Sequence, residues 1–201
     1  MFTNIWRYRP RADVRGLQLF VPDVPKISLD RVADAVRLAN LPITDDFRDA
    51  MHHFHNPPPA APHDSPPTCG LHDEDVMVLL QRGLVRPIER AEVRNWVRCF
   101  SVPETSKNRR RFIAHPQSQN EATFNAGPRL ASIDDLRQGI IDYNFGAVGD
   151  VKACFQHFAL PLAAQPFFAF VVDSVPSSPA YALTTIPTGS RWSPSVAHTF
   201  T

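Results

Sequence analysis

Apolar residues at helical spacing predict two helices in the first half of the chain. Over 28–40 they recur every three or four residues, which predicts a helix with Ser28 as its N-cap. A second helix is expected over 73–82, ended by Gly83 as the C′ residue. The stretch between them is rich in proline and favours polyproline geometry over packing. We therefore expect an N-terminal arm with one helix over 1–51, a linker over 52–71 and a domain over 72–201.

Alternating apolar residues predict strands in the rest of the chain. Residues 96–102 have the composition and partial alternation of a strand, and 112–114 are expected to be its hairpin partner. The turn between them carries cations that we expect at the hairpin tip, namely Lys107, Arg109, Arg110 and Arg111. The other predicted elements are strands over 167–172 and 181–186, a helix over 132–141 and a helix from 193, with Ser193 as cap and Pro194 at N1. This pattern predicts an α/β (mixed α+β) fold in which helices pack on an antiparallel sheet.

One carboxylate follows a buried segment. The apolar run over 144–148 predicts a strand that ends near Asp150. Burying an unpaired carboxylate is costly, so such groups are usually paired or bound to a metal. An Asp that ends a strand and caps the next turn is the simpler interpretation, and the strand alone does not decide between them.

Charge and cysteine usage narrow the class of protein. The formal charge of +1 hides a basic block, because residues 82–111 hold nine Lys/Arg and three Asp/Glu. Such a block is either a polyanion-binding surface or a solvated face. Three widely spaced cysteines indicate neither a disulfide framework nor a zinc knuckle and favour an intracellular, reducing setting. We find no signal-peptide pattern and no apolar run that could span a bilayer.

Histidines in the predicted linker raise a metal hypothesis. The candidate ligands are His52, His53, His55, His63, Cys69 and His72. Their spacing matches no standard zinc pattern, so a polar linker is the preferred interpretation.

The order of motifs along the domain is specific. A helix ending in Leu-Leu-Gln-Arg-Gly-Leu-Val-Arg-Pro over 79–87 precedes the basic hairpin, and Arg-Phe-Ile-Ala over 111–114 is followed by Asn120. Then come the capped helix, the strand ending in Asp150 with an aromatic residue five positions later, and Ile-Pro-Thr-Gly-Ser-Arg-Trp-Ser-Pro over 186–194. This series resembles the fingers and the first half of the palm of retroelement reverse transcriptases, the RNA-directed DNA polymerases of retrotransposons, and covers residues 72–201.

The resemblance implies a two-metal site. Asp150 matches the catalytic aspartate that holds both magnesium ions, and the Val151 carbonyl would add a second oxygen ligand; Mg²⁺ prefers such hard ligands. The two ions would activate the primer 3′ hydroxyl and stabilise the leaving pyrophosphate. Phe155 matches the aromatic residue that excludes ribonucleotides, although an ordinary core aromatic remains the alternative.

The resemblance also implies contacts to the nucleotide and the template. The fingers cations would clamp the triphosphate with fork-shaped donors: Lys107, Arg109, Arg110 and Arg111. Thr188 and Gly189 would lie against the nucleotide and the template base, with Gly189 allowing close backbone approach. Arg191 would contact template phosphate. The implied partners are an RNA or DNA template-primer and a deoxynucleoside triphosphate, with no membrane.

The chain also departs from the family. His115 and Gln117 stand where many members have an acidic and a basic residue, and Thr188 replaces a bulkier one. The paired aspartates of the Tyr-x-Asp-Asp hairpin do not occur before Thr201. We therefore expect the chain as given to be a fragment that is inactive alone. A non-catalytic nucleic-acid-binding module and a degenerate retroelement remnant are the alternatives.

Overall fold

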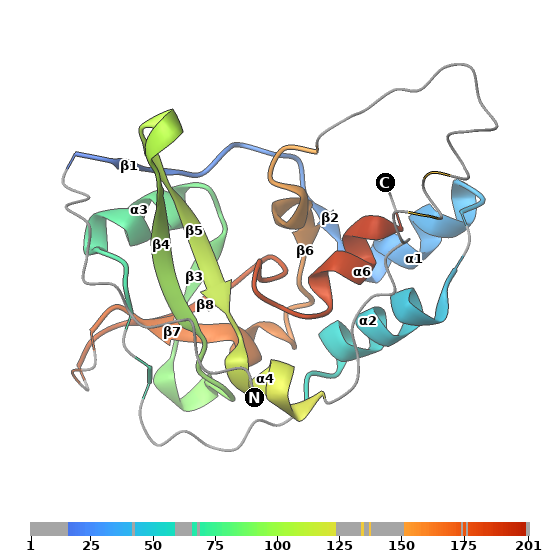
Figure 1. Ribbon diagram of the computed structural model, residues 1–201. Helices are drawn as coiled ribbons and strands as arrows, with labels where there is room; N and C mark the ends of the chain where they lie inside the picture. Colours follow the sequence, from blue (N-terminus) through green and yellow to red (C-terminus); the bar gives the residue numbers. More distant parts are fainter. Residues whose placement is uncertain are drawn as a thin grey trace, which may run out of the picture.

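The computed structural model is a mixed α+β fold with helices and several small sheets (Figure 1). It describes residues 16–41, 43–58, 66–67, 69–123, 134, 137, 151–173, 175 and 177–199. The strands are β1 (Gln18–Phe20), β2 (Ile27–Ser28), β3 (Val85–Ile88), β4 (Arg98–Glu104), β5 (Arg109–His115), β6 (Phe158–Ala159), β7 (Ala169–Val171) and β8 (Ala180–Leu183). The α-helices are α1 (Leu29–Leu38), α2 (Asp45–His55), α3 (Asp73–Gln81), α4 (Gln117–Ala122) and α6 (Ser193–His198). The 3₁₀-helices are η1 (Arg90–Glu92), η2 (Thr105–Lys107), η3 (Cys154–His157) and η4 (Gln165–Phe168).

The strands of the described residues form three small sheets rather than one antiparallel sheet. Their orders are β1-β5-β4, β2-β6 and β3-β8-β7. The third sheet is antiparallel, whereas β1 runs parallel to β5 and β2 runs parallel to β6. The predicted antiparallel pairing occurs in β4–β5 and in β3-β8-β7, but the strands lie in three sheets, and two parallel partners, β1 and β2, come from the N-terminal stretch. Parallel partners need long connections, so no local turn sequence reveals them.

The basic hairpin forms as predicted, but its arginines are not at the tip. β4 and β5 pair in antiparallel register with Glu104 opposite Arg109, and the turn is closed by Asn108 in the left-handed region, with φ of 47°. Lys107 lies in the turn, whereas the three arginines begin β5. Successive strand residues point to opposite faces. Arg110 therefore points into the protein, and Arg109 and Arg111 point outward.

The two helices predicted from the first half are confirmed. Ser28 caps α1, because its Oγ accepts a hydrogen bond from the Asp30 amide at 3.2 Å. α3 ends before Gly83, whose φ of 61° is the left-handed conformation that glycine adopts without strain.

The helix α2 was missing from the sequence prediction. Thr44 caps it by accepting a hydrogen bond from the Phe47 amide at 3.2 Å, and Phe47, Ala50 and Phe54 are buried on one face. Its last turn contains histidines that were predicted to begin the linker. Residues 52–55 are therefore helical, and the N-terminal stretch holds two helices rather than one.

The remaining predicted elements have mixed outcomes. The strands expected over 167–172 and 181–186 are present in shorter form as β7 and β8. Ser193, the predicted cap, is the first residue of α6, so the N-cap is Trp192, and the Ser193 hydroxyl donates to the Pro187 carbonyl at 2.7 Å. Of the helix expected over 132–141, the two described residues are helical. The predicted strand over 144–148 and Asp150 lie outside the described residues.

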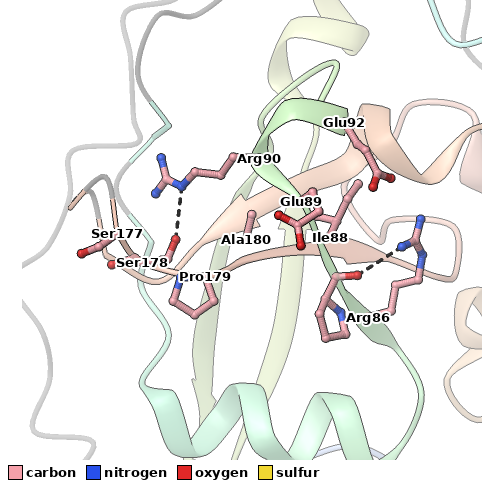
Figure 2. A pocket seen from close by; sticks show the side chains of 10 residues that line it. Arg86, Ile88, Glu89, Arg90, Glu92, Ser177, Ser178, Pro179 and Ala180 are labelled. Atoms are coloured by element: carbon pink, nitrogen blue, oxygen red, sulfur yellow. Dashed lines mark hydrogen bonds between the residues drawn. The ribbon is translucent and has the colours of Figure 1, made fainter.

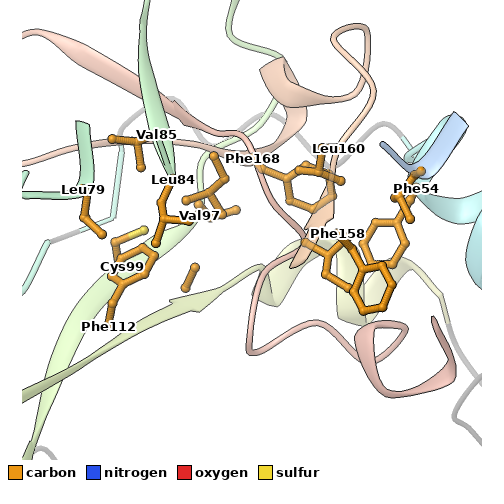
Figure 3. Packing of buried hydrophobic residues seen from close by; sticks show 14 of the residues in the cluster. Phe54, Leu79, Leu84, Val85, Val97, Cys99, Phe112, Phe158, Leu160 and Phe168 are labelled. Atoms are coloured by element: carbon orange, nitrogen blue, oxygen red, sulfur yellow. The ribbon is translucent and has the colours of Figure 1, made fainter. Parts of the chain in front are cut away.

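One main apolar core joins the described parts of the predicted arm and domain. Figure 3 shows it running from Leu79 and Phe112, near α3 and the hairpin, to Phe54 and Phe158. Leu19 of β1 and Val32 of α1 belong to the same cluster. The hairpin and α3 lie at one end of the molecule, and α1, α2 and α6 lie at the other (Figure 1). No helix in the described ranges is long and apolar enough to cross a membrane.

Candidate nucleotide and nucleic-acid site

Arg110 is a buried ion-pair residue that ties the hairpin to α3. Its Nη1 and Nη2 donate to the two carboxylate oxygens of Asp75 at 2.8 and 2.7 Å. Its Nε donates to the Leu17 carbonyl, and Nη1 also reaches the Ser101 hydroxyl, both at 2.8 Å. The side chains of Arg110 and Asp75 are 9% and 4% exposed. The Arg110 guanidinium therefore donates its hydrogen bonds to groups within the protein.

The other three fingers cations share one carboxylate, that of Glu104. The Lys107 Nζ lies 3.4 Å and the Arg111 Nε lies 4.0 Å from Glu104 Oε1, while the Arg109 Nε donates to Oε2. The hydrogen bond from Arg109, with a smaller contribution from Lys107, holds the pKa of Glu104 below its ordinary value. Lys107 and Arg111 remain 59% and 60% exposed. They are the cations of this cluster that an external anion reaches most easily.

The Phe20 ring contacts both Arg109 of the cation cluster and Lys152, which lies in the segment after Asp150. The guanidinium carbon of Arg109 lies 3.7 Å from the Phe20 ring centroid, and the Lys152 Nζ lies 5.5 Å from the same centroid. Both distances are within the range of cation–π contacts. Lys152 follows Asp150 by two residues, and Asp150 itself lies outside the described residues.

The predicted nucleotide loop is bonded to the opposite end of β5. The Gly189 amide donates to the Ala114 carbonyl at 2.8 Å, and the Thr188 hydroxyl accepts from the Ala114 amide at 3.2 Å. A Cβ added at Gly189 would lie 2.7 Å from the Ala114 carbonyl oxygen and 3.0 Å from the His115 Cα. The close approach of the two backbones therefore requires glycine at position 189.

Asn120 of α4 fixes the conformation of this loop. Its side-chain amide donates to the Gly189 carbonyl at 2.8 Å and accepts from the Arg191 amide at 2.9 Å. The Arg191 side chain is exposed, and its Nη1 donates to the Thr123 carbonyl at 3.0 Å. Among the described residues, this is the hydrogen bond that the Arg191 guanidinium makes.

The outer face of the sheet β1-β5-β4 combines aromatic and cationic side chains. Strand register places Phe100 opposite Ile113, Val102 opposite Arg111 and Arg98 opposite His115 on this face. Phe20 is aligned with Arg111 in the neighbouring strand, and the Arg98 guanidinium lies 5.7 Å from the Phe100 ring centroid. Aromatic rings for base stacking and cations for phosphates are typical of sheets that bind single-stranded nucleic acid.

The two remaining predicted positions lie in and before η3. Phe155 is half-buried and packs against the main core, and the Val151 side chain is 46% exposed. No group of three His, Cys, Asp or Glu side chains lies close enough to hold a metal within the described part of the chain. Asp150, the expected magnesium ligand, lies outside the described residues.

Two hollows on the described surface differ in their relation to the candidate site. The larger, of about 980 Å³, lies between β1 and α3, and its lining includes Arg110 and Lys152. The smaller, of about 470 Å³, lies at the end of β3, where Arg90 donates to the Ser178 carbonyl at 3.2 Å (Figure 2). None of the predicted site residues that the structure describes lines the smaller hollow. It is therefore separate from the candidate site.

Glu104, Phe20 and Lys152 were not predicted as parts of this candidate site. Glu104 stands five residues before Arg109, and a two-strand register would have placed the two side by side. Phe20 and Lys152 had no local signal, because their contacts depend on the parallel pairing of β1 with β5.

No protein-family model and no curated protein matches this chain.

Proposed function

We propose that this chain contributes the fingers and the first part of the palm of a retrotransposon RNA-directed DNA polymerase. In this role it would bind a deoxynucleoside triphosphate and a template-primer for nucleotidyl transfer. The paired aspartates needed for the two-metal reaction would come from a further part of the palm.

One observation carries the proposal: β5 links the candidate residues. Exposed cations stand at its beginning, and the loop with Thr188 and Gly189 is bonded to Ala114 near its end. The segment after Asp150 reaches the same strand through the contacts of Lys152 and Arg109 with Phe20. A nucleotide lying along β5 would meet cations at its phosphates and a closely packed loop at its base.

In this proposal the candidate residues divide into groups with different roles. Lys107, Arg109 and Arg111 would bind the phosphates, and Arg110 would hold the hairpin in place through Asp75. Phe155 would crowd the sugar, Thr188 and Gly189 would lie against the base, and Arg191 would meet template phosphate. Asp150 and the Val151 carbonyl would hold magnesium, which when bound supplies positive charge for the leaving pyrophosphate.

Steady-state primer extension tests these roles. The protein is the chain extended by the C-terminal part of a related palm, with an RNA template, Mg²⁺ and dNTPs. We expect Arg111→Gln to raise KM for the nucleotide about tenfold or more, as loss of a charge-assisted contact does. Arg48→Gln, an exposed arginine on α2, is the matched control and should leave KM unchanged. An Arg111→Gln protein with wild-type kinetics, or an extended protein without incorporation, would contradict the proposal.

The outer sheet face favours a second candidate function, non-catalytic binding of single-stranded RNA. Its basis is the combination of Phe20 and Phe100 with Arg98 and Arg111 on one face. Binding through phosphates weakens steeply as salt displaces the protein's cations. We expect affinity for an oligonucleotide to fall markedly between about 50 and 200 mM salt, and Phe100→Ala to weaken it further. Affinity that is independent of salt would exclude this function.

A further inference from the structure

The Glu104 carboxylate occupies the position that an anion would take. Its Oε1 faces the Lys107 Nζ at 3.4 Å and the Arg111 Nε at 4.0 Å, while Oε2 accepts from the Arg109 Nε. Three cations thus surround one carboxylate, which leaves the cluster with an excess of positive charge. A phosphate group offers the same kind of oxygen acceptors with more negative charge.

A bound phosphate and the Glu104 carboxylate would compete for the same N–H donors. A phosphate bound by this cluster would use the same N–H groups that now face Glu104. Glu104 is 18% exposed and Lys107 and Arg111 are about 60% exposed, so the cations are open to solvent while the carboxylate lies between them. The pairs that Glu104 makes with Lys107 and Arg111 are open to solvent on the side of the cation, and ion pairs of this kind contribute little energy.

We propose that Glu104 is an internal competitor for the polyphosphate site of the fingers, so that a polyphosphate binds by displacing its carboxylate from Lys107, Arg109 and Arg111. This inference rests on the proposed function and adds a regulatory element to the same site. The opposite role is that Glu104 preorganises the three cations for the ligand. The two roles predict opposite signs when the charge of Glu104 is removed.

Titration with sodium tripolyphosphate distinguishes them. Calorimetry is done on the chain as it is, at low ionic strength, without magnesium or nucleic acid. Glu104→Gln keeps the shape of the side chain and removes its charge. We expect about fivefold tighter binding, the combined effect of releasing several weak ion pairs. Glu89→Gln makes the same change in net charge at an exposed glutamate outside the cluster and should change affinity less than about twofold.

A second measurement uses the wild-type protein and does not depend on a variant that folds. Carboxyl ¹³C NMR follows the titration of Glu104 with and without tripolyphosphate. Since the cations hold the Glu104 pKa below its ordinary value, displacement by the ligand should raise that pKa toward the ordinary value. Circular dichroism confirms that the Glu104→Gln protein is folded.

Each outcome is decisive. Weaker or unchanged tripolyphosphate binding by Glu104→Gln, an absence of binding in both proteins, or an unchanged Glu104 pKa in the presence of ligand would overturn the proposal. Tighter tripolyphosphate binding by Glu104→Gln, together with no nucleotide incorporation by the palm-extended protein, would support Glu104 as a competitor and reject the proposed function. An active polymerase whose tripolyphosphate affinity falls in Glu104→Gln would reject the competitor alone.

Discussion

Arg110 and Arg111 are adjacent in the sequence and have opposite surroundings. Arg110 is buried on Asp75, and Arg111 is 60% exposed near Glu104. Strand alternation explains the difference, because only one of two successive residues points into the core. At the scale of single residues, the basic run therefore divides into a buried structural cation and solvent-facing cations.

Removing Arg110 should therefore affect stability far more than removing Arg111. Arg110→Met leaves the Asp75 carboxylate buried and unpaired, which costs about 3 to 5 kcal/mol of unfolding free energy. Arg111→Met should change it by less than about 0.5 kcal/mol, as for other surface positions. Urea unfolding measures both, and the double variant Arg110→Met/Asp75→Leu should recover part of the loss. Equal effects of the two single substitutions would contradict the buried ion pair.

His53 should make the fold sensitive to mild acid. Burial, with a smaller contribution from the charge of His52, lowers the pKa of His53 to about 4. The unfolded chain, with an ordinary pKa near 6.5, binds the proton more readily, so stability is full above about pH 6.5 and falls between pH 6.5 and 4. The expected loss attributable to His53 is about 3 kcal/mol.

Urea unfolding at pH 7 and pH 4.5 checks this prediction. His53→Leu should flatten the pH dependence of stability relative to the wild type, whereas His52→Gln, at an exposed neighbouring position, should retain most of it. An unchanged pH profile in His53→Leu would show that other groups cause the acid sensitivity.

At the scale of elements, the loop over 187–192 depends on its close contact with β5. A methyl group at Gly189 would meet the Ala114 carbonyl at 2.7 Å, so the loop must move. Gly189→Ala should cost about 1 to 3 kcal/mol, as overpacked substitutions do. Ser177→Ala, in an exposed turn, is the control and should be neutral in thermal unfolding. A neutral Gly189→Ala would show that the loop adapts without this contact.

Local sequence signals predicted some elements and not others. Caps and helical periods predicted α1 and α3, and alternation predicted the β4–β5 hairpin, because each signal lies within a few residues. The buried face of α2 has helical spacing, but the histidines of its last turn were assigned to the linker, and the helix was not predicted. The pairs β1–β5 and β2–β6 join segments far apart in sequence and have no local signal. The cations of the candidate site lie in the hairpin, which has a local signal, and were therefore predictable. Their partners Phe20 and Lys152 come from distant segments and were not.

At the scale of the whole molecule, the N-terminal stretch and the hairpin share a core. β1 pairs with β5, and α2 packs on α6. We therefore expect one unfolding transition in which tryptophan fluorescence and far-UV circular dichroism coincide. A cooperative transition would also exclude the degenerate-remnant interpretation.

Deleting the N-terminal stretch tests the shared core. A protein of residues 72–201 lacks Leu19 and the buried faces of α1 and α2, so it should aggregate or unfold without cooperativity. Deleting residues 1–15 alone is the control. A 72–201 protein as stable as the full chain would show that this part folds independently.

The central claim, a polymerase palm segment organised around Asp150 and the fingers cations, is tested most directly by one comparison. Primer extension on an RNA template with Mg²⁺ compares Asp150→Ala with Asp173→Ala in the palm-extended protein. Asp173 is an exposed aspartate outside the candidate site. The account predicts that Asp150→Ala lowers the extension rate at least about 100-fold, a typical contribution of one catalytic group, while Asp173→Ala retains it. Equal rates in the two variants, at any level of activity, would contradict the claim.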